Sequence, residues 1–116
     1  MKDNLKEVRP WGSYEILLDD SKCKVKRITV NPNSRLSYQY HHKRSEKWVC
    51  VEGQLTVVIE DETFTLNYGE AIEIPLGYKH RAQNKTQTPV EFIEVQIGTY
   101  FGEDDIIRIE DDYSRK

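Results

Sequence analysis

Short runs of alternating apolar and polar residues dominate the chain, and segments with the repeat of an amphipathic helix are nearly absent. The runs are rich in Val, Ile, Tyr and Thr, and Gly, Pro and Asn residues separate them, as in β-strands joined by turns. We therefore predict strands at 14–18, 23–30, 36–41, 46–51, 54–60, 63–66, 70–75, 79–83 and 89–97. Strands this short, separated by turn residues, indicate an all-β sandwich or barrel.

Side chains along a strand point alternately to its two faces, so the polar residues of the predicted strands can be sorted by face. Gln39 and His41 share one face of the run 36–41, and Glu94 and Gln96 share one face of a later run. A polar stripe of this kind is either a solvated face or the lining of a barrel cavity. Composition alone favours the solvated face.

The distribution of the three histidines points to the second possibility. Two of them stand in QYHHKRSEKWVCVEG (39–53), and the third, His80, stands in a stretch rich in Gly and Pro. Gln39 and His41 share a face, Glu46 follows after a gap long enough for a turn, and His80 could complete the group. Imidazole, carboxylate and amide oxygen donors suit a divalent ion such as Zn²⁺, Mn²⁺, Co²⁺, Ni²⁺ or Fe²⁺.

Composition limits the remaining possibilities. The 116 residues are enough for one domain, 1–116, and the net charge of −3 with mixed acids and bases implies no polyanion-binding face. We therefore expect no nucleic-acid partner. Apolar runs are far shorter than the roughly 18 residues of a membrane span, and the polar N-terminus has no signal-peptide core, so we expect no membrane contact and a cytoplasmic protein.

Two stretches resemble the two sequence motifs of the cupin superfamily. Residues 46–53 (EKWVCVEG) resemble the end of the first motif, with Gln39 at the position of its usual first histidine. Residues 69–84 (GEAIEIPLGYKHRAQN) match the Gly, Pro, Gly, His and Asn positions of the second motif. The resemblance implies an antiparallel jelly-roll barrel. It also implies one divalent metal ion bound by Gln39, His41, Glu46 and His80.

A narrower resemblance covers the chain from Arg9 to Arg115. The blocks that carry it are RPWGSY (9–14), VKRITV (25–30), LSYQYHHKRSEKWVCVEG (36–53), IPLGYKHRAQN (74–84) and EVQIGTYFGEDDIIRIEDDYSR (94–115). They are similar to the type II phosphomannose isomerase domain, and the chain departs from that pattern at Tyr38, Lys43 and Ser114. The resemblance implies interconversion of mannose 6-phosphate and fructose 6-phosphate through a cis-enediol, a step that supplies precursors of nucleotide sugars.

The domain it resembles usually follows a mannose-1-phosphate guanylyltransferase. This chain has no such half and no glycine-rich nucleotide loop, so we expect that it does not make GDP-mannose by itself. Two alternatives stay open within the cupin superfamily. One is a non-catalytic sugar-binding module. The other is a metal-dependent oxygenase, which normally uses Fe²⁺ on two histidines and one carboxylate and needs no cations for a phosphate.

The isomerisation requires a base within reach of two sugar carbons and a cationic clamp for the phosphate. For the base, Glu94 is the first candidate, followed by Lys26 and Lys79. For the phosphate, the candidates are Arg9, Arg27 and Arg108, because guanidinium binds phosphate in a bidentate fork. Lys26 and Arg27 are neighbours on one predicted strand, so only one of them can easily face the cavity.

The two ends of the chain flank this core as an N-terminal arm, 1–8, and an acidic C-terminal tail, 102–116. On composition alone the tail is solvated surface. Apolar residues within and just before it nevertheless provide surface for docking: Tyr100, Phe101, Ile106, Ile107 and Ile109. We therefore predict a docked tail that places Arg108 at the cavity mouth, against the substrate phosphate. By analogy with other cupins, we also expect a homodimer.

Overall fold

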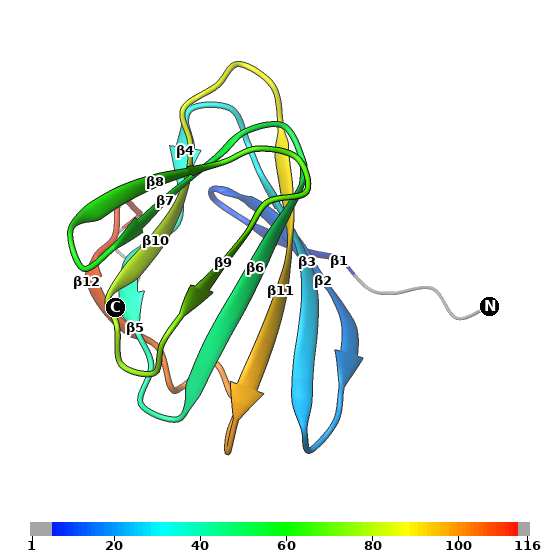
Figure 1. Cartoon of the computed structure of the whole chain (residues 1–116), viewed down its shortest axis with the longest axis vertical. Helices are drawn as coiled ribbons and strands as arrows, with labels where there is room; N and C mark the ends of the chain where they lie inside the picture. Colours follow the sequence, from blue (N-terminus) through cyan, green and yellow to red (C-terminus); the bar gives the residue numbers. More distant parts are fainter. Residues whose placement is uncertain (1–5, 114–116) are drawn as a thin grey trace.

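The computed structural model describes residues 6–113, which form two antiparallel β-sheets that face each other (Figure 1). The first sheet contains, in spatial order, β1 (Lys6–Arg9), β2 (Gly12–Asp19), β3 (Cys23–Val30), β11 (Val90–Gly98), β6 (Arg44–Glu52) and β9 (Ala71–Ile74). The second contains β12 (Ile107–Glu110), β5 (Tyr38–Tyr40), β10 (His80–Asn84), β7 (Leu55–Ile59) and β8 (Glu62–Leu66), with β4 (Ser34–Arg35) paired to β10. The predicted all-β class is confirmed.

Each predicted run contains a strand, and the structure adds three short strands outside these runs. These are β1, β4 and β12, which are only two to four residues long. A strand this short has too few residues to show a period, and its pairing partner determines that it forms. Residues 6–8 of the expected arm belong to β1, which pairs with β2, whereas residues 1–5 lie outside the described residues.

The interior of the barrel is divided into an apolar half and a polar half. The buried side chains of the apolar half include Ile28, Val30, Trp48, Cys50, Leu55, Val57, Ala82, Val90 and Phe92. Those of the polar half are Lys24, Lys26, His41, Arg44, Glu46, His80, Glu94 and Gln96. The change occurs along single strands, because Phe92 is followed on the same face of β11 by Glu94 and Gln96. These two polar residues therefore face inward.

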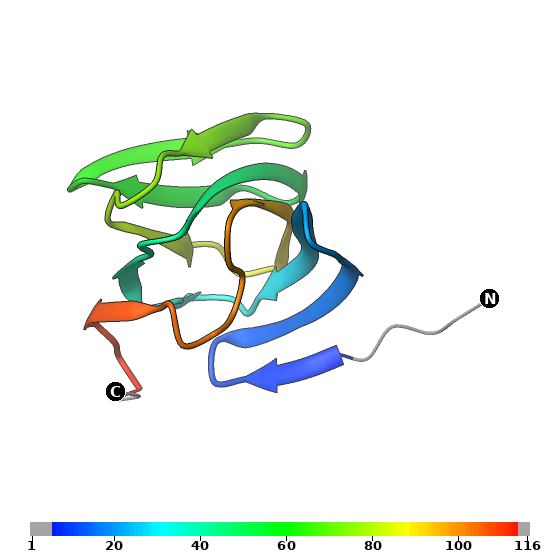
Figure 2. The same cartoon turned by 90° about the horizontal axis from the view of Figure 1, so that it is seen from below.

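The C-terminal segment is held against the second sheet. β12 pairs with β5, and the buried Arg81 donates hydrogen bonds to the backbone oxygen of Leu36 and to the carboxylate of Glu110. Figure 2 shows the segment between β11 and β12 running across one end of the barrel. Residues 114–116 of the expected tail lie outside the described residues. Among residues 6–113, no helix is long and apolar enough to cross a membrane.

Candidate active site

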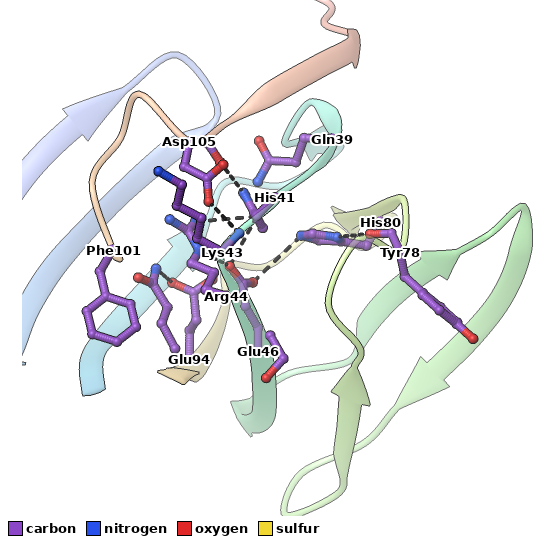
Figure 3. A network of polar contacts seen from close by, with 12 residues as sticks. Gln39, His41, Lys43, Arg44, Glu46, Tyr78, His80, Glu94, Phe101 and Asp105 are labelled. Atoms are coloured by element: carbon purple, nitrogen blue, oxygen red, sulfur yellow. Dashed lines mark hydrogen bonds and ion pairs between the residues drawn. The ribbon is translucent and has the colours of Figure 1, made fainter. Parts of the chain in front are cut away.

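Three of the predicted metal ligands meet in the polar half of the interior (Figure 3). His41 follows β5, Glu46 lies on β6 and His80 begins β10, and one donor atom of each lies within 4.8 Å of the other two. The Glu46 carboxylate lies between the imidazoles, 3.2 Å from Nε2 of His41 and 3.7 Å from Nε2 of His80. All three side chains are buried, so an ion held between them would be shielded from water.

Both imidazoles are oriented by hydrogen bonds at their other nitrogen. Nδ1 of His41 lies 2.8 Å from the backbone oxygen of Asp105, and Nδ1 of His80 lies 2.9 Å from that of Tyr78. A carbonyl oxygen only accepts, so each Nδ1 carries a proton, and each Nε2 is turned towards Glu46. Nε2 of His80 is buried and has no hydrogen-bond partner. These donors and their backbone supports fit a divalent metal ion.

The fourth predicted ligand, Gln39, lies on the correct face but is engaged elsewhere. Gln39 is paired directly with His80 across β5 and β10, so the two side chains share a face of the sheet. Its Oε1 accepts a hydrogen bond of 2.8 Å from the hydroxyl of Ser37, and the side chain lines the cavity next to the cluster. Metal ligation by Gln39 stays a prediction.

Arg44 is a site residue that the sequence reasoning missed. Its Nε donates to Glu46 at 2.9 Å, a second nitrogen lies 3.4 Å from Nε2 of His41, and its buried Nη1 has no hydrogen-bond partner. Burial alone would raise the pKa of Glu46, but its contacts with His41, His80 and Arg44 lower this pKa well below its ordinary value. Strand parity could have identified Arg44, because it stands two residues before Glu46 on β6.

A cavity with an excess of positive charge adjoins the cluster, and Gln39 and Arg44 line it. The charged side chains that line it are Arg9, Lys26, Arg44, Arg108, Glu94 and Glu103. Of these, Arg108 comes from β12 and has a buried Nε with no hydrogen-bond partner. Four cations against two carboxylates favour an anionic ligand.

The structure corrects the prediction for Arg27. Lys26 is buried and lines the cavity, whereas the Arg27 side chain is half exposed on the outer face of β3, with its Nε 3.9 Å from Glu91. Alternation along the strand allows only one of the two neighbours to point inward, and the packing of β3 selects Lys26. Arg9 and Arg108 therefore remain as candidate phosphate ligands. Lys79 is exposed and does not line the cavity.

Glu94 has the properties expected of a general base. It lines the cavity, it is buried, and its Oε2 accepts a hydrogen bond of 2.9 Å from Nε2 of Gln96. Burial, together with the nearby negative charge of Glu46, raises the pKa of Glu94 to about 8. Lys26, the other candidate, is a weaker one, because its ammonium pairs with Glu103 at 3.2 Å and lies 4.2 Å from the centre of the Tyr14 ring.

The jelly-roll barrel with an inward-facing His–Glu–His cluster defines a cupin. Residues 1–111 match the family described as "Mannose-6-phosphate isomerase C-terminal", and the chain belongs to this family. It is 47% identical over 110 residues to the xanthan biosynthesis protein XanB of Xanthomonas campestris (95% of this chain, 24% of that protein). It is 46% identical over 107 residues to the mannose-1-phosphate guanylyltransferase ManC of Salmonella typhimurium (92% and 22%). The chain thus spans about a quarter of these relatives.

Solved structures support the fold assignment. A sugar phosphate isomerase of the cupin superfamily from Silicibacter pomeroyi superposes with a TM-score of 0.70 at 21% identity, covering 90% of this chain and 79% of that chain. A double-stranded β-helix protein from Klebsiella pneumoniae superposes with a TM-score of 0.73 at 16% identity, covering 93% and 85%. The cupin class predicted from the two motifs is confirmed.

Proposed function

We propose that this chain is a metal-dependent aldose–ketose isomerase that interconverts mannose 6-phosphate and fructose 6-phosphate. The observation that carries the proposal is the juxtaposition of the His41–Glu46–His80 cluster with a cationic cavity that contains Glu94. Isomerisation of a sugar phosphate uses a base, an electrophile that stabilises the developing oxyanion, and a site for the phosphate; a bound metal ion can serve as the electrophile. Membership of the mannose-6-phosphate isomerase C-terminal family supports the same activity.

The substrate phosphate would bind between Arg9, Lys26 and Arg108. The buried, unpaired Nε of Arg108 supports this assignment, since a guanidinium with free donors is suited to bidentate recognition of phosphate. Arg9 lines the same cavity, and one of its nitrogens donates to the Tyr14 hydroxyl at 3.1 Å, which limits its orientation. An open-chain sugar whose phosphate binds here could extend its C1 and C2 atoms towards the cluster.

Glu94 would remove the proton from C2 to give a cis-enediol(ate) and return it at C1, while the hydroxyl proton of O2 passes to O1. Its pKa of about 8 lies near the working range of a general base, and Gln96 holds one carboxylate oxygen in place. A divalent ion held by His41, Glu46 and His80, with Gln39 as the proposed fourth ligand, would supply a Lewis acid for the developing oxyanion. The free Nη1 of Arg44 can donate to the same oxygen.

The test is turnover of mannose 6-phosphate in a coupled assay that detects fructose 6-phosphate. The metal-stripped protein should be inactive, and adding back Zn²⁺, Mn²⁺, Co²⁺, Ni²⁺ or Fe²⁺ one at a time should restore activity with at least one of them. Free mannose, which has no phosphate for the clamp, should be a far poorer substrate. Equal activity with and without metal would refute the proposed mechanism.

One alternative has an observation behind it, namely a non-catalytic module that binds a sugar phosphate. Arg44 donates to Glu46 and also lies against Nε2 of His41, so it partly neutralises the cluster without any ion. The same assay separates the two functions, because such a module would bind mannose 6-phosphate in a calorimetric titration without turning it over. The cationic cavity disfavours the oxygenase alternative, which has no need of a phosphate clamp.

Replacing Arg108 with lysine should weaken catalysis although the charge is kept. Lysine cannot form the bidentate fork, so we expect kcat/KM for mannose 6-phosphate to fall. The expected loss of transition-state stabilisation is about 1–3 kcal/mol. The matched control is Arg27→Lys, because Arg27 lies outside the cavity and should tolerate the same change. Unchanged kcat/KM in both Arg108→Lys and Arg108→Ala would remove Arg108 from the phosphate site.

A further inference from the structure

The segment 99–106, which joins β11 to β12, closes over the polar half of the barrel (Figure 2). It is attached to the barrel by its backbone as well as its side chains. The amide of Thr99 donates to the backbone oxygen of Lys43 at 3.0 Å, and Nζ of Lys24 lies 3.5 Å from the backbone oxygen of Phe101. The segment therefore contacts the turn that follows the metal ligand His41.

Asp105 contacts this turn in two ways. Its carboxylate accepts hydrogen bonds from the amides of His42 at 3.0 Å and Lys43 at 2.9 Å. Its backbone oxygen lies 2.8 Å from Nδ1 of His41. Only 7% of the Asp105 surface is exposed, and its own amide donates to the backbone oxygen of Gly102 at 3.1 Å. One residue thus holds both the ring of His41 and the two amides that follow it in the chain (Figure 3).

We propose that Asp105 is a positioning residue that fixes the tautomer and the direction of the His41 imidazole. The inference rests on the proposed metal-dependent function. The Asp105 carboxylate binds the backbone amides directly after His41, so the Asp105 carbonyl stays within hydrogen-bond distance of Nδ1. The carbonyl keeps the proton on Nδ1 and leaves Nε2 free for the metal, as partners of metal-binding histidines generally do.

The proposal gives the C-terminal segment a role that the two cupin motifs do not include. His41 and Glu46 lie in the first motif region and His80 in the second, whereas Asp105 comes from a segment beyond both. Metal affinity should therefore depend on the docking of residues 99–106 as well as on the ligands themselves. The neighbouring Asp104 provides a contrast, because its carboxylate accepts a hydrogen bond from the Tyr100 hydroxyl on the surface.

The test compares Asp105→Asn with the matched control Asp104→Asn, which makes the same chemical change one residue away. The asparagine amide would face one of the two backbone N–H groups and lose that hydrogen bond. Calorimetric titration of Co²⁺ into the metal-stripped proteins should show affinity lowered by roughly 10- to 100-fold in Asp105→Asn, the usual effect of losing a partner of a metal-binding histidine. The control should bind Co²⁺ as the wild type does.

A second measurement reports on His41 directly and does not require metal. In metal-free wild-type protein, ¹⁵N NMR should place a proton on Nδ1 of His41, and Asp105→Asn should show a fraction of His41 in which Nδ1 is unprotonated. Thermal melts of the metal-free proteins establish that both variants are folded. A purely structural role for Asp105 would change the melting temperature while leaving the tautomer and the Co²⁺ affinity of the folded variant unchanged.

Two outcomes would overturn the proposal. One is a wild-type His41 whose Nδ1 carries no proton, which decides the matter even where Asp105→Asn fails to fold. The other is a folded Asp105→Asn variant with wild-type Co²⁺ affinity. Failure of the wild type to bind any divalent ion is a different result. It would refute the metal-dependent function, and the NMR measurement would still decide whether Asp105 positions His41.

Discussion

Replacing His80 with alanine is expected to abolish both metal binding and turnover of mannose 6-phosphate while the barrel stays folded. The change removes one of three donors, and the Nε2 that is lost has no other partner. A metal ion contributes several kcal/mol to stabilisation of an oxyanion transition state, so we expect kcat to fall by roughly a thousand-fold or more. Metal content of the purified protein and the coupled assay measure the two effects.

The third histidine of the chain provides the control. His42 is exposed beside the cluster and makes an edge contact with Tyr40, so His42→Ala should keep both metal and activity. His80 is 1% exposed, and its removal leaves a void, so the melting temperature of His80→Ala should fall without loss of the cooperative transition. Full activity in a His80→Ala protein that contains no metal would refute the metal site.

Replacing Glu94 with glutamine should lower kcat by roughly 10²- to 10⁴-fold, the usual contribution of a general base. Glutamine keeps the shape and the hydrogen-bonding capacity of the side chain but cannot accept the substrate proton. The matched control is Glu91→Gln. Glu91 lies on the same strand, but its carboxylate is on the outer face, 3.9 Å from Nε of Arg27. Wild-type kcat in Glu94→Gln would show that another group takes the proton.

Glu94→Gln should also change how the stability of the folded protein depends on pH, and this effect can be measured separately from catalysis. In the folded, metal-free protein the pKa of Glu94 is raised from 4.5 to about 8, so the folded state holds this proton more tightly than the unfolded state. The contribution of Glu94 to stability therefore decreases as pH rises from 4.5 to 8. Glu94→Gln lacks this decrease, and urea unfolding between pH 5 and pH 9 should show a flatter profile than the wild type.

Strand alternation was sufficient to predict much of the site from sequence. The period of two places Glu46 on the same face of β6 as the buried Trp48, and Glu94 on the same face of β11 as the buried Phe92. The resemblance to the two cupin motifs then implied His41 and His80 as partners of Glu46, and the structure brings all three together. The two face assignments succeeded because they depend on local geometry, which neighbouring residues in the chain determine, whereas the meeting of the three side chains followed from the family resemblance.

Alternation failed where both faces of a strand offered a charged residue. It could not choose between Lys26 and Arg27, because apolar residues of opposite parity flank the pair on β3. The choice depends on which face of β3 packs against the second sheet. The apolar half of the barrel decides this, since Ile28 and Val30 must be buried and Lys26 shares their face. The expected role of Arg27 was therefore wrong.

By itself, the sequence determined the nine predicted runs that contain strands, the inward faces of β6 and β11, and the identities of the three clustered side chains. Only the tertiary structure decided which residues distant in the chain support them. Arg108 reaches the cavity because β12 pairs with β5, and Asp105 holds His41 because the segment before β12 crosses the end of the barrel. The contacts of Asp105 join residues 63 or 64 positions apart, and they depend on how the sheets close, which no local pattern records.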